Sequence, residues 1–480
     1  MNKHYVHCAI PYVNAPPHIG HTLDFIYTDV IARFHRLIGD EVLTLSGADE
    51  NALKNVQAAE KEGVDTQTLV DRNSKLFSEF AEKLNIKFDV FQRGSDKEKH
   101  YPASQKLWQL CQASDDIYKK SYKGLYCVGC EVFYTPDELN SEGECFEHPG
   151  RKLEEVEEEN YFFKLSKYQD KIIELINSGE YQIIPEKRKN EVLSFVKSGL
   201  EDISISRTNE RAKNWGVPVP GDSSHRMYVW FDALNIYQSG VGFGWDEEKY
   251  QKWWPADLEI IGKGILRFHA VYWIAFLLSA GLKLPKALLI HDYFTVDGQK
   301  MSKTVGNVYD PVPLLDKFGA DPLRYYCLAK ISPFEDGDFS EEKFFEVYNA
   351  DLANNLGNLI SRVAKLCETS NLKVDPLDKQ SLDQEIIKTL ETYQFNLALQ
   401  TIWKKIDNLN KQIDSEKLWE NTDQKHDILA NIVESILCVS VNLQPFLPET
   451  AAKIEEQFKG PKIKSGEPLF PRLQRFARSQ

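Results

Sequence analysis

The chain has 480 residues, of which 42% are hydrophobic and 27% are charged. These fractions are ordinary for a soluble globular protein, and the length predicts roughly two to four domains. A net charge of −14 argues against indiscriminate nucleic-acid binding. The longest apolar stretch, Val271–Ala280, is too short to span a bilayer, and the N-terminus does not look like a signal peptide. With eight scattered cysteines, we expect a cytoplasmic protein without a membrane partner.

The first fifty residues predict an α/β unit. His4–Ile10 is an apolar strand candidate, apolar residues recur at helical spacing from Leu23 to Leu37, and Glu41–Leu45 is a second strand candidate. Gly39 is placed to end the helix. The loop before the helix should lie at the carboxyl end of a parallel strand, where open sheets bind ligands.

From about Ser121 the sequence changes to short strands and turns, which predicts an insertion that splits the α/β domain. An acidic run within it, Glu154–Glu159, is expected to be solvated surface. The α/β pattern then returns, with elements expected at these positions: strands Met227–Phe231, Leu258–Ile261 and Ala287–His291, helix Leu266–Leu278 and a turn at Val296–Gly298.

After about Asp310 the chain is expected to be a helical bundle. Apolar residues recur at helical spacing, or lie between prolines, in four segments: Asn349–Leu366, Leu382–Leu409, Asp427–Leu443 and Glu449–Phe458.

Two short motifs are suited to phosphate chemistry. The first, His18-Ile19-Gly20-His21, should open a helix, whose N-terminal N–H groups attract phosphate. Gly20 lets a ligand approach the backbone, and the two histidines can donate to phosphate oxygens. The second, Lys300-Met301-Ser302-Lys303-Thr304, places two lysines three apart where they can neutralise charge on a triphosphate. Either motif alone is more often an ordinary turn or loop. In this order and on either side of an insertion, they resemble the paired signatures of class I aminoacyl-tRNA synthetases.

The wider resemblance is to methionyl-tRNA synthetases and covers nearly the whole chain. It is carried by five segments: residues 10–18 (IPYVNAPPH), 228–234 (YVWFDAL), 261–263 (IGK), 268–269 (FH) and 295–303 (TVDGQKMSK). It implies a Rossmann-like parallel sheet that is split by a zinc-containing insertion and followed by an α-helical domain. The implied segments are 1–115 and 216–305 for the two halves of the catalytic domain, 116–215 for the insertion, 306–345 for a stem-contact linker and 346–480 for anticodon binding.

The resemblance also implies a two-step reaction. The methionine carboxylate attacks the α-phosphate of ATP, and the terminal adenosine of tRNA(Met) then takes the methionyl group. His18, His21, Lys300 and Lys303, with Mg²⁺, would stabilise the phosphates. The ATP-binding set would be completed by Gly20, Gly262 and Ser302. Asp49 would meet the ammonium group of L-methionine, and its side chain would lie among Ile10, Tyr12, Trp230, Ala233, Leu234, Tyr237, Ile265 and His269.

The cysteines predict one structural zinc ion in the insertion. Cys127 and Cys130 form a C-x2-C pair, and Cys145 and His148 form a C-x2-H pair, which together suit tetrahedral zinc. A disulfide would be unusual in the cytoplasm and would leave His148 unexplained. The remaining cysteines are expected to be buried apolar residues: Cys8, Cys111, Cys327, Cys367 and Cys438.

Asn358 and Arg362, four apart on a predicted helix, resemble the residues that read the CAU anticodon in the family. A polar helix face is the alternative reading. The family stacks an anticodon base on a tryptophan in the last helical segment, for which we expect Phe458 as a substitute. Nothing follows Gln480 that resembles an appended dimerising module, so a monomer is expected.

The sequence departs from the family pattern at several points: Glu50-Asn51-Ala52 replaces Glu-His-Gly after the aspartate, Gly264 replaces an Asp, Asp292 replaces a Gly and Thr304 replaces a Ser. Two other functions stay open at this point. A class I synthetase for another apolar amino acid would normally need a larger editing insertion. A paralogue that binds RNA without catalysis would account for the altered positions but not for both retained signatures.

Overall fold

The structure is a computed structural model that describes residues 2–127, 132–134, 139–145, 150, 152–301, 307–374, 381–420 and 425–473. Contacts divide the chain into two compact units. Unit 1 comprises Met1–Pro17, Gly39–Ala81 and Lys87–His291, and unit 2 comprises His18–Ile38, Glu82–Ile86 and Asp292–Gln480. These units group segments that are distant in sequence, and they do not test the five segments predicted above.

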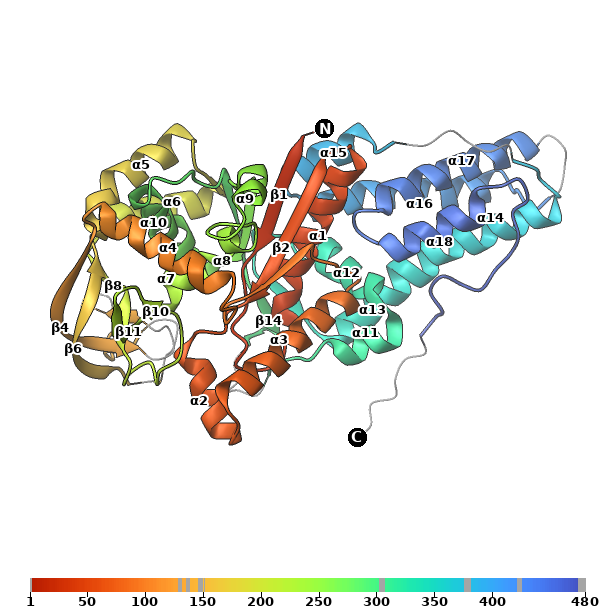
Figure 1. Cartoon of the computed structure of the whole chain (residues 1–480). Helices are drawn as coiled ribbons and strands as arrows, with labels where there is room; N and C mark the ends of the chain where they lie inside the picture. Colours follow the sequence, from red (N-terminus) through yellow and green to blue (C-terminus); the bar gives the residue numbers. More distant parts are fainter. Residues whose placement is uncertain are drawn as a thin grey trace. The chain divides into compact units, whose positions relative to one another are not determined.

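A six-stranded parallel sheet forms the centre of unit 1 (Figure 1). Its order is β3-β2-β1-β12-β13-β7. The strands are β1 (Lys3–Cys8), β2 (Glu41–Ala48), β3 (Val90–Arg93), β7 (Gln182–Ile184), β12 (Leu258–Gly262) and β13 (Ala287–His291). Parallel central strands are buried on both faces, which explains why the sequences of β12 and β13 are so apolar. The predicted parallel sheet is therefore confirmed.

Two antiparallel sheets lie in the remainder of unit 1. One has the order β5-β4-β6-β8 and the other β10-β11-β9. Their strands are β4 (Ile117–Cys127), β5 (Val132–Tyr134), β6 (Glu154–Phe163), β8 (Ile203–Ser204), β9 (Ser206–Thr208), β10 (Pro218–Val219) and β11 (Asp222–Met227). The acidic run begins β6, where most of its glutamates are exposed, as expected.

One strand prediction in unit 1 is wrong. The segment Met227–Phe231 does not form a strand, because β11 ends at Met227 and a short helix, α7 (Val229–Ala233), begins two residues later. Short apolar runs fit a buried helix as well as a strand, and periodicity alone cannot distinguish the two. The prediction at Leu266–Leu278 is correct in type, although this helix opens with a π-helical stretch, Phe268–Trp273, before α10 (Ile274–Ser279).

Unit 1 also contains other helices and an aromatic group within its core. Trp108 packs edge-on against Phe231, which in turn contacts Phe276. These helices are α2 (Leu53–Glu62), α3 (Thr66–Lys83), α4 (His100–Ala113), α5 (Gln169–Ser178), α6 (Glu186–Lys197), α8 (Ile236–Ser239) and α9 (Glu247–Trp253), with 3₁₀ turns at Leu165–Tyr168 and Lys263–Ile265.

Unit 2 contains α1 (Thr22–Leu37), preceded by a 3₁₀ turn at Ile19–His21, and a small sheet of order β15-β14-β16. β14 (Phe294–Val296) and β15 (Gln299–Lys300) form a hairpin, and β16 (Gly337–Phe339) pairs with β14 in parallel. Asp297 and Gly298 form the turn, with φ of 51° and 75°. Both central residues of a tight hairpin turn adopt positive φ, so the predicted turn is confirmed.

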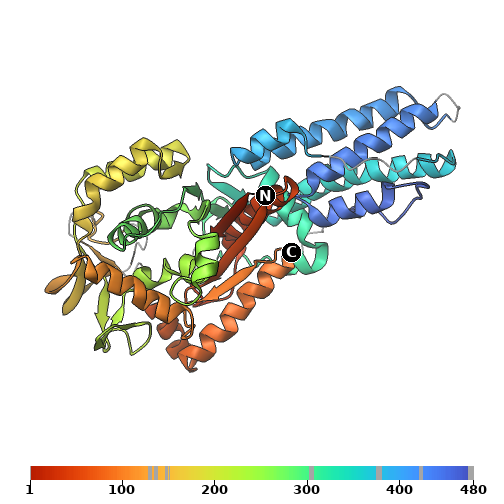
Figure 2. The ribbon, with the colours of Figure 1, turned by 45° about the horizontal axis from the view of Figure 1, so that its top comes forward.

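The remainder of unit 2 is the predicted helical region, whose long helices α14, α16, α17 and α18 pack on one another (Figure 2). The helices are α11 (Val312–Phe318), α12 (Ala320–Ala329), α13 (Glu341–Val347), α14 (Asn358–Thr369), α15 (Gln384–Glu391), α16 (Phe395–Ser415), α17 (His426–Leu443) and α18 (Pro448–Phe458), with a π-helical stretch at Tyr348–Gly357. The single helix predicted at Leu382–Leu409 is two helices, because Tyr393 adopts a φ of 59° between them. Among the described helices, α17 is the one apolar and long enough to cross a membrane. It is half buried against α14, α16 and α18, as a core helix is.

Candidate active site

A chain of hydrogen bonds joins three of the residues predicted to hold methionine. Tyr237 on α8 and His269 on the π-helical stretch are both buried, and the Tyr237 hydroxyl lies 2.9 Å from Nε2 of His269. Nδ1 of His269 lies 3.0 Å from the carbonyl oxygen of Ile265. A carbonyl only accepts, so Nδ1 carries the imidazole proton and Nε2 accepts from Tyr237. Burial lowers the pKa of His269 to about 4, which keeps the ring neutral.

An aromatic group extends from this chain. The Trp230 ring stacks on Phe268 with centroids 3.9 Å apart and an interplanar angle of 4°. Tyr12 and His269 each meet Trp230 edge-on, with centroids 6.2 Å away. Trp230 is 7% exposed. A flexible apolar side chain with a polarizable sulfur suits such surroundings, since thioethers contact ring edges favourably.

Asp49 lies beside this aromatic group. It follows β2, where Tyr12 and Asp49 form an isolated parallel bridge and the Asp49 N–H donates to the carbonyl oxygen of Pro11 at 2.9 Å. The Asn55 side chain donates to the Asp49 carbonyl oxygen at 3.0 Å, which fixes the backbone from the other side. Asp49 is only 4% exposed. The other predicted members of the pocket are placed nearby along the chain: Ala233 and Leu234 are buried after Trp230, and half-buried Ile10 packs on the same core.

Two buried polar residues beneath Tyr237 were not predicted. His7 on β1 and Glu259 on β12 face each other in register, and Nε2 of His7 lies 3.2 Å from Oε1 of Glu259. The His7 ring also stacks on Tyr237, with centroids 3.8 Å apart. A charged residue within an apolar parallel strand is a signal that sequence inspection could have used.

The departure at Glu50-Asn51-Ala52 has a structural explanation. The Asn51 side-chain amide donates to Oδ2 of Asp232 at 2.6 Å and to the carbonyl oxygen of Gly94 at 2.8 Å. Asp232 is buried, which raises the pKa of its carboxyl group. Glu50 is buried and ion-paired with Arg93 at 2.7 Å. Asn51 therefore supplies a donor to a buried acid, whose Oδ2 also lies 3.4 Å from Nε2 of His100.

In unit 2, the two histidines of the first signature bond the backbone that starts the helix. Nδ1 of His18 accepts from the Gly20 N–H at 3.1 Å, and Nδ1 of His21 accepts from the His18 N–H at 3.0 Å. The rings are 3.9 Å apart between centroids. In a neutral imidazole whose Nδ1 accepts, the proton is on Nε2. Both histidines therefore carry their ring proton on Nε2.

A side chain at Gly20 would crowd two neighbouring side chains. A Cβ added there would lie 2.9 Å from the His18 ring and 3.0 Å from the side chain of Met301. Lys300 belongs to β15, directly before Met301. Ser302, Lys303 and Thr304 lie outside the described residues. Gly262, the predicted ATP contact in unit 1, ends β12.

Two of the four predicted zinc ligands lie in the described part of the insertion. Cys127 ends β4, and its sulfur lies 3.2 Å from that of Cys145. Both side chains are buried. Cys130 and His148 lie outside the described residues, and the described residues alone form no cluster of three or more metal-ligating groups. Of the other cysteines, four are buried as expected, whereas Cys438 is half-buried.

In the helical bundle, Asn358 begins α14 and is half-buried. Arg362 lies one turn later and donates to Asp414 at 2.6 Å. The expectation for Phe458 is wrong, because its side chain is completely buried and cannot stack on a base. Trp419, which follows α16, is 53% exposed and is not among the predicted residues.

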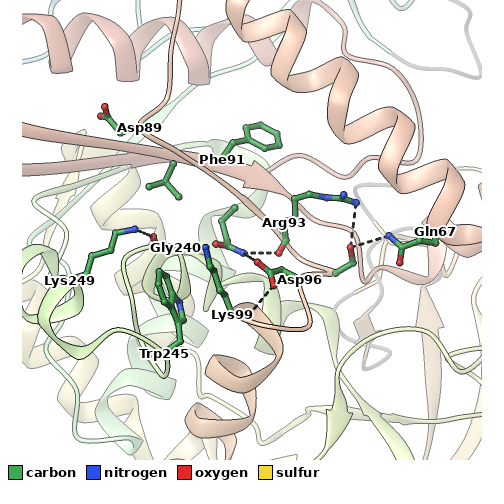
Figure 3. Close-up of a pocket in the computed structure, with 12 residues that line it drawn as sticks. Gln67, Asp89, Phe91, Arg93, Asp96, Lys99, Gly240, Trp245 and Lys249 are labelled. Atoms are coloured by element: carbon green, nitrogen blue, oxygen red, sulfur yellow. Dashed lines mark hydrogen bonds between the residues drawn. The ribbon is translucent and has the colours of Figure 1, made fainter.

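A separate cavity of about 560 Å³ opens beside β3 (Figure 3). Trp245 lies between two lysines there, with Nζ of Lys99 and of Lys249 at 4.7 and 5.3 Å from its ring centroid. None of the residues predicted to bind methionine or ATP is among those that line it. The candidate active site is therefore not this cavity.

A parallel sheet together with a helical C-terminal region is the fold of class I synthetases. A sequence profile of the family described as "tRNA synthetases class I (M)" matches residues 4–364. The methionine–tRNA ligase of Brucella suis is 42% identical, over 94% of this chain and 91% of that protein. The corresponding protein of Clostridium acetobutylicum is 40% identical, over 98% of this chain and 78% of that protein.

The chain is also similar to solved structures of methionyl-tRNA synthetases. The Mycobacterium tuberculosis methionyl-tRNA synthetase in complex with methionyl-adenylate has a TM-score of 0.90 and 38% identity, and the match covers 98% of this chain and all of that one. The chain belongs to the methionyl-tRNA synthetase family.

Proposed function

We propose that the chain activates L-methionine with ATP and transfers it to tRNA(Met). The observation that carries this proposal is the Tyr237–His269–Ile265 hydrogen-bond chain beside the Trp230 aromatic group. The Tyr237 hydroxyl and the Nδ1–H of His269 each donate to an acceptor within this chain, so neither is left to bind a polar side chain. A polar side chain in the pocket would lose its bonds to water without replacement, whereas a thioether loses little.

Asp49 is the proposed partner of the methionine ammonium group. Its backbone is held on both sides by Pro11 and Asn55. A buried carboxylate at a fixed position favours an amino acid over its deaminated analogue, since the analogue would leave the charge unpaired. The carboxylate of methionine is itself the nucleophile toward the α-phosphate, so the activation step needs no nucleophile from the protein.

His18, His21, Lys300 and Lys303 are proposed to stabilise the triphosphate, with Gly20, Gly262 and Ser302 as further ATP contacts. The Nε2–H donors of the two histidines are directed by their Nδ1 bonds, and preorganised donors need no rearrangement as charge develops. Mg²⁺ accompanies ATP as the usual counter-ion of its phosphates. The proposed contribution of the lysines of the second signature is their positive charge.

We further propose that Cys127, Cys130, Cys145 and His148 hold one structural zinc ion. The close approach of the buried Cys127 and Cys145 sulfurs fits a shared metal. Zinc would tie the end of β4 to the loop that precedes β6, in a segment with few buried apolar residues. This is a folding role, because four protein ligands leave no open position for chemistry.

For tRNA, we propose that Asn358, Arg362 and Trp419 contact the anticodon. The Arg362–Asp414 ion pair ties α14 to the end of α16, just before Trp419. An exposed tryptophan offers a stacking surface for an unpaired base, and the two polar residues can reach base edges. We also propose that the protein acts as a monomer in the cytoplasm.

ATP–pyrophosphate exchange measured with each of the twenty amino acids tests the proposed activity. Methionine should support exchange, and the other amino acids should not approach its rate. If another amino acid supported faster exchange than methionine, the assignment of L-methionine as the substrate would be refuted. Binding of tRNA without exchange for any amino acid would indicate a paralogue that lacks the enzymatic activity.

A further inference from the structure

His7 and Glu259 are the most unusual polar residues of the parallel sheet. Both are completely buried, on the adjacent strands β1 and β12, and neither has a place in the proposed reaction. No hydrogen bond satisfies either ring nitrogen of His7, and Oε1 of Glu259 also lacks one. Burying such groups costs several kcal/mol unless they interact with each other. Their 3.2 Å separation supplies that interaction, and Oε2 of Glu259 also accepts from the Tyr181 hydroxyl at 3.5 Å.

The pair is in contact with the polar wall of the methionine pocket. The His7 ring lies against the face of Tyr237, with an interplanar angle of 16°. Tyr237 is the residue whose hydroxyl donates to His269. From the other side, the Tyr5 hydroxyl donates to the Tyr237 carbonyl oxygen at 2.7 Å. A change of charge at His7 or Glu259 therefore acts on the ring that orients His269.

Burial changes the proton affinities of the two residues in opposite directions. It raises the pKa of Glu259 to about 7 and lowers the pKa of His7 to about 3. Between these values the pair holds one proton and is neutral. Above about pH 7 that proton is lost, and a negative charge remains beneath the pocket.

Several other groups face the pair. Tyr5 and Cys8 lie on β1, Tyr181 precedes β7, and Tyr237, His269 and Trp273 complete the surroundings. Burial raises the pKa of Tyr5, Tyr181 and Tyr237 well above the usual value, and it lowers that of His269 to about 4.

We propose that His7 and Glu259 are positioning residues that share one proton beneath the methionine pocket, and that this shared proton sets the affinity for methionine by keeping the Tyr237–His269 wall neutral and in place. The inference rests on the proposed assignment of Tyr237 and His269 to the pocket. Neither His7 nor Glu259 touches the substrate. Loss of the shared proton should weaken methionine binding and leave ATP binding unchanged.

Methionine-dependent ATP–pyrophosphate exchange between pH 6 and 8 tests the inference. The KM for methionine of the unaltered enzyme should rise about tenfold across this range, because the protonated fraction of a group with a pKa near 7 falls about tenfold. Glu259→Gln imitates the protonated state and should keep a low KM throughout. His7→Phe keeps a ring against Tyr237 but leaves Glu259 without its partner, so it should raise the KM above pH 7, where the carboxyl group is ionised.

The double variant His7→Phe/Glu259→Leu provides the decisive comparison. Removing both partners leaves no buried charge, so its KM should be lower than that of His7→Phe and independent of pH. A residue needed only for packing would instead give additive losses. Cys111→Ala, a truncation in the same core, controls for lost packing and should lower the melting temperature without changing either KM.

A pH-independent KM in the unaltered enzyme, or an unchanged pH profile in Glu259→Gln, would overturn the inference. A parallel rise in the KM for ATP would also overturn it, since the effect would not be specific to the methionine pocket. The absence of methionine-dependent exchange at any pH would instead refute the proposed function.

Discussion

Arg324 and Asp29 form a buried ion pair within unit 2. Nη2 of Arg324 lies 2.7 Å from Oδ2 of Asp29, and the arginine side chain is completely buried. The same guanidinium group donates to the carbonyl oxygens of Phe446, Pro445 and Leu84. These bonds join α1 and α12 to the segment before α18. Asp29 also accepts from Arg33 on α1 at 2.7 Å, whereas Arg324 bonds to all of these segments at once.

Replacing Arg324 with Met should destabilise the protein by about 3–5 kcal/mol, because the change leaves the Asp29 carboxylate and three carbonyl groups without this donor. The free energy of unfolding from urea denaturation measures this loss. Lys404→Met, at an exposed position of α16 in the same unit, is the matched control and should change stability by less than about 0.5 kcal/mol. Equal effects from the two variants would contradict the role given to Arg324.

Replacing Tyr237 with Phe should raise the KM for methionine by about tenfold, since Nε2 of His269 would lose its donor at a cost of about 1–3 kcal/mol. The KM for ATP should stay unchanged. Tyr250→Phe removes a comparable buried hydroxyl, bonded to Gln238 at 2.6 Å, and serves as the control. If Tyr250→Phe raises the KM for methionine as much, the effect is one of general packing.

At His18, two substitutions separate phosphate binding from helix initiation. His18→Ala removes both the Nε2 donor and the Nδ1 acceptor, whereas His18→Asn retains a side-chain acceptor at a helix N-cap. Both should slow adenylate formation by about 10²–10³-fold. Only His18→Ala should also lower the melting temperature. Pre-steady-state adenylate formation and thermal unfolding report the two effects, and equal melting temperatures would argue against the capping role.

Lys303→Ala should slow adenylate formation strongly with little change in methionine affinity, because the proposed contact forms with the phosphates. Single-turnover kinetics at varied methionine concentration measure both quantities. An equal loss in rate and in methionine affinity would exclude the proposed role.

Removing zinc should destabilise the insertion without abolishing the active site directly. The purified protein should contain about one zinc ion per chain. Cys145→Ser should lower the zinc content by disrupting the ligand set, and chelation should make the β4–β6 segment exchange amide hydrogens faster. Cys438→Ser, at a half-buried position in the bundle, is the control and should keep its zinc. If the zinc-free protein exchanged its amide hydrogens at an unchanged rate, the proposed zinc site would be contradicted.

Replacing Trp419 with Ala should weaken the binding of tRNA(Met) by about 1–3 kcal/mol, because base stacking on the indole ring is lost. ATP–pyrophosphate exchange, which needs no tRNA, should not change. Phe458→Ala should instead lower stability, because Phe458 is buried. A Trp419 variant with normal aminoacylation kinetics would exclude it from the anticodon site.

Patterns within a single segment allowed most elements to be predicted. Strand Ala287–His291 and the helix at Glu449–Phe458 were located to within a residue, because proline, glycine or charged residues bound their apolar runs. The break at Tyr393 could not be predicted, since residues on both sides keep helical spacing and a positive φ at tyrosine has no sequence signal. Met227–Phe231 was too short for its periodicity to be decisive.

The candidate site was less accessible to such reasoning. The pairing of His7 with Glu259 depends on the register of two parallel strands that are far apart in sequence, and this register is set by the whole sheet. The Nδ1 bonds of His18 and His21 likewise depend on backbone geometry at one turn. The residue types of the first signature indicated phosphate chemistry, whereas the tautomers of His18 and His21 depend on the folded backbone.

The two units are interleaved along the chain, which passes between them after Pro17, Ile38, Ala81, Ile86 and His291. No single cut releases either unit with all of its parts. A fragment ending at His291 would keep Asp29 but lose Arg324, and a fragment starting at Asp292 would keep Arg324 without its acid. Neither unit is encoded by one continuous stretch of the gene. A single recombination event therefore cannot replace one unit and leave the other intact.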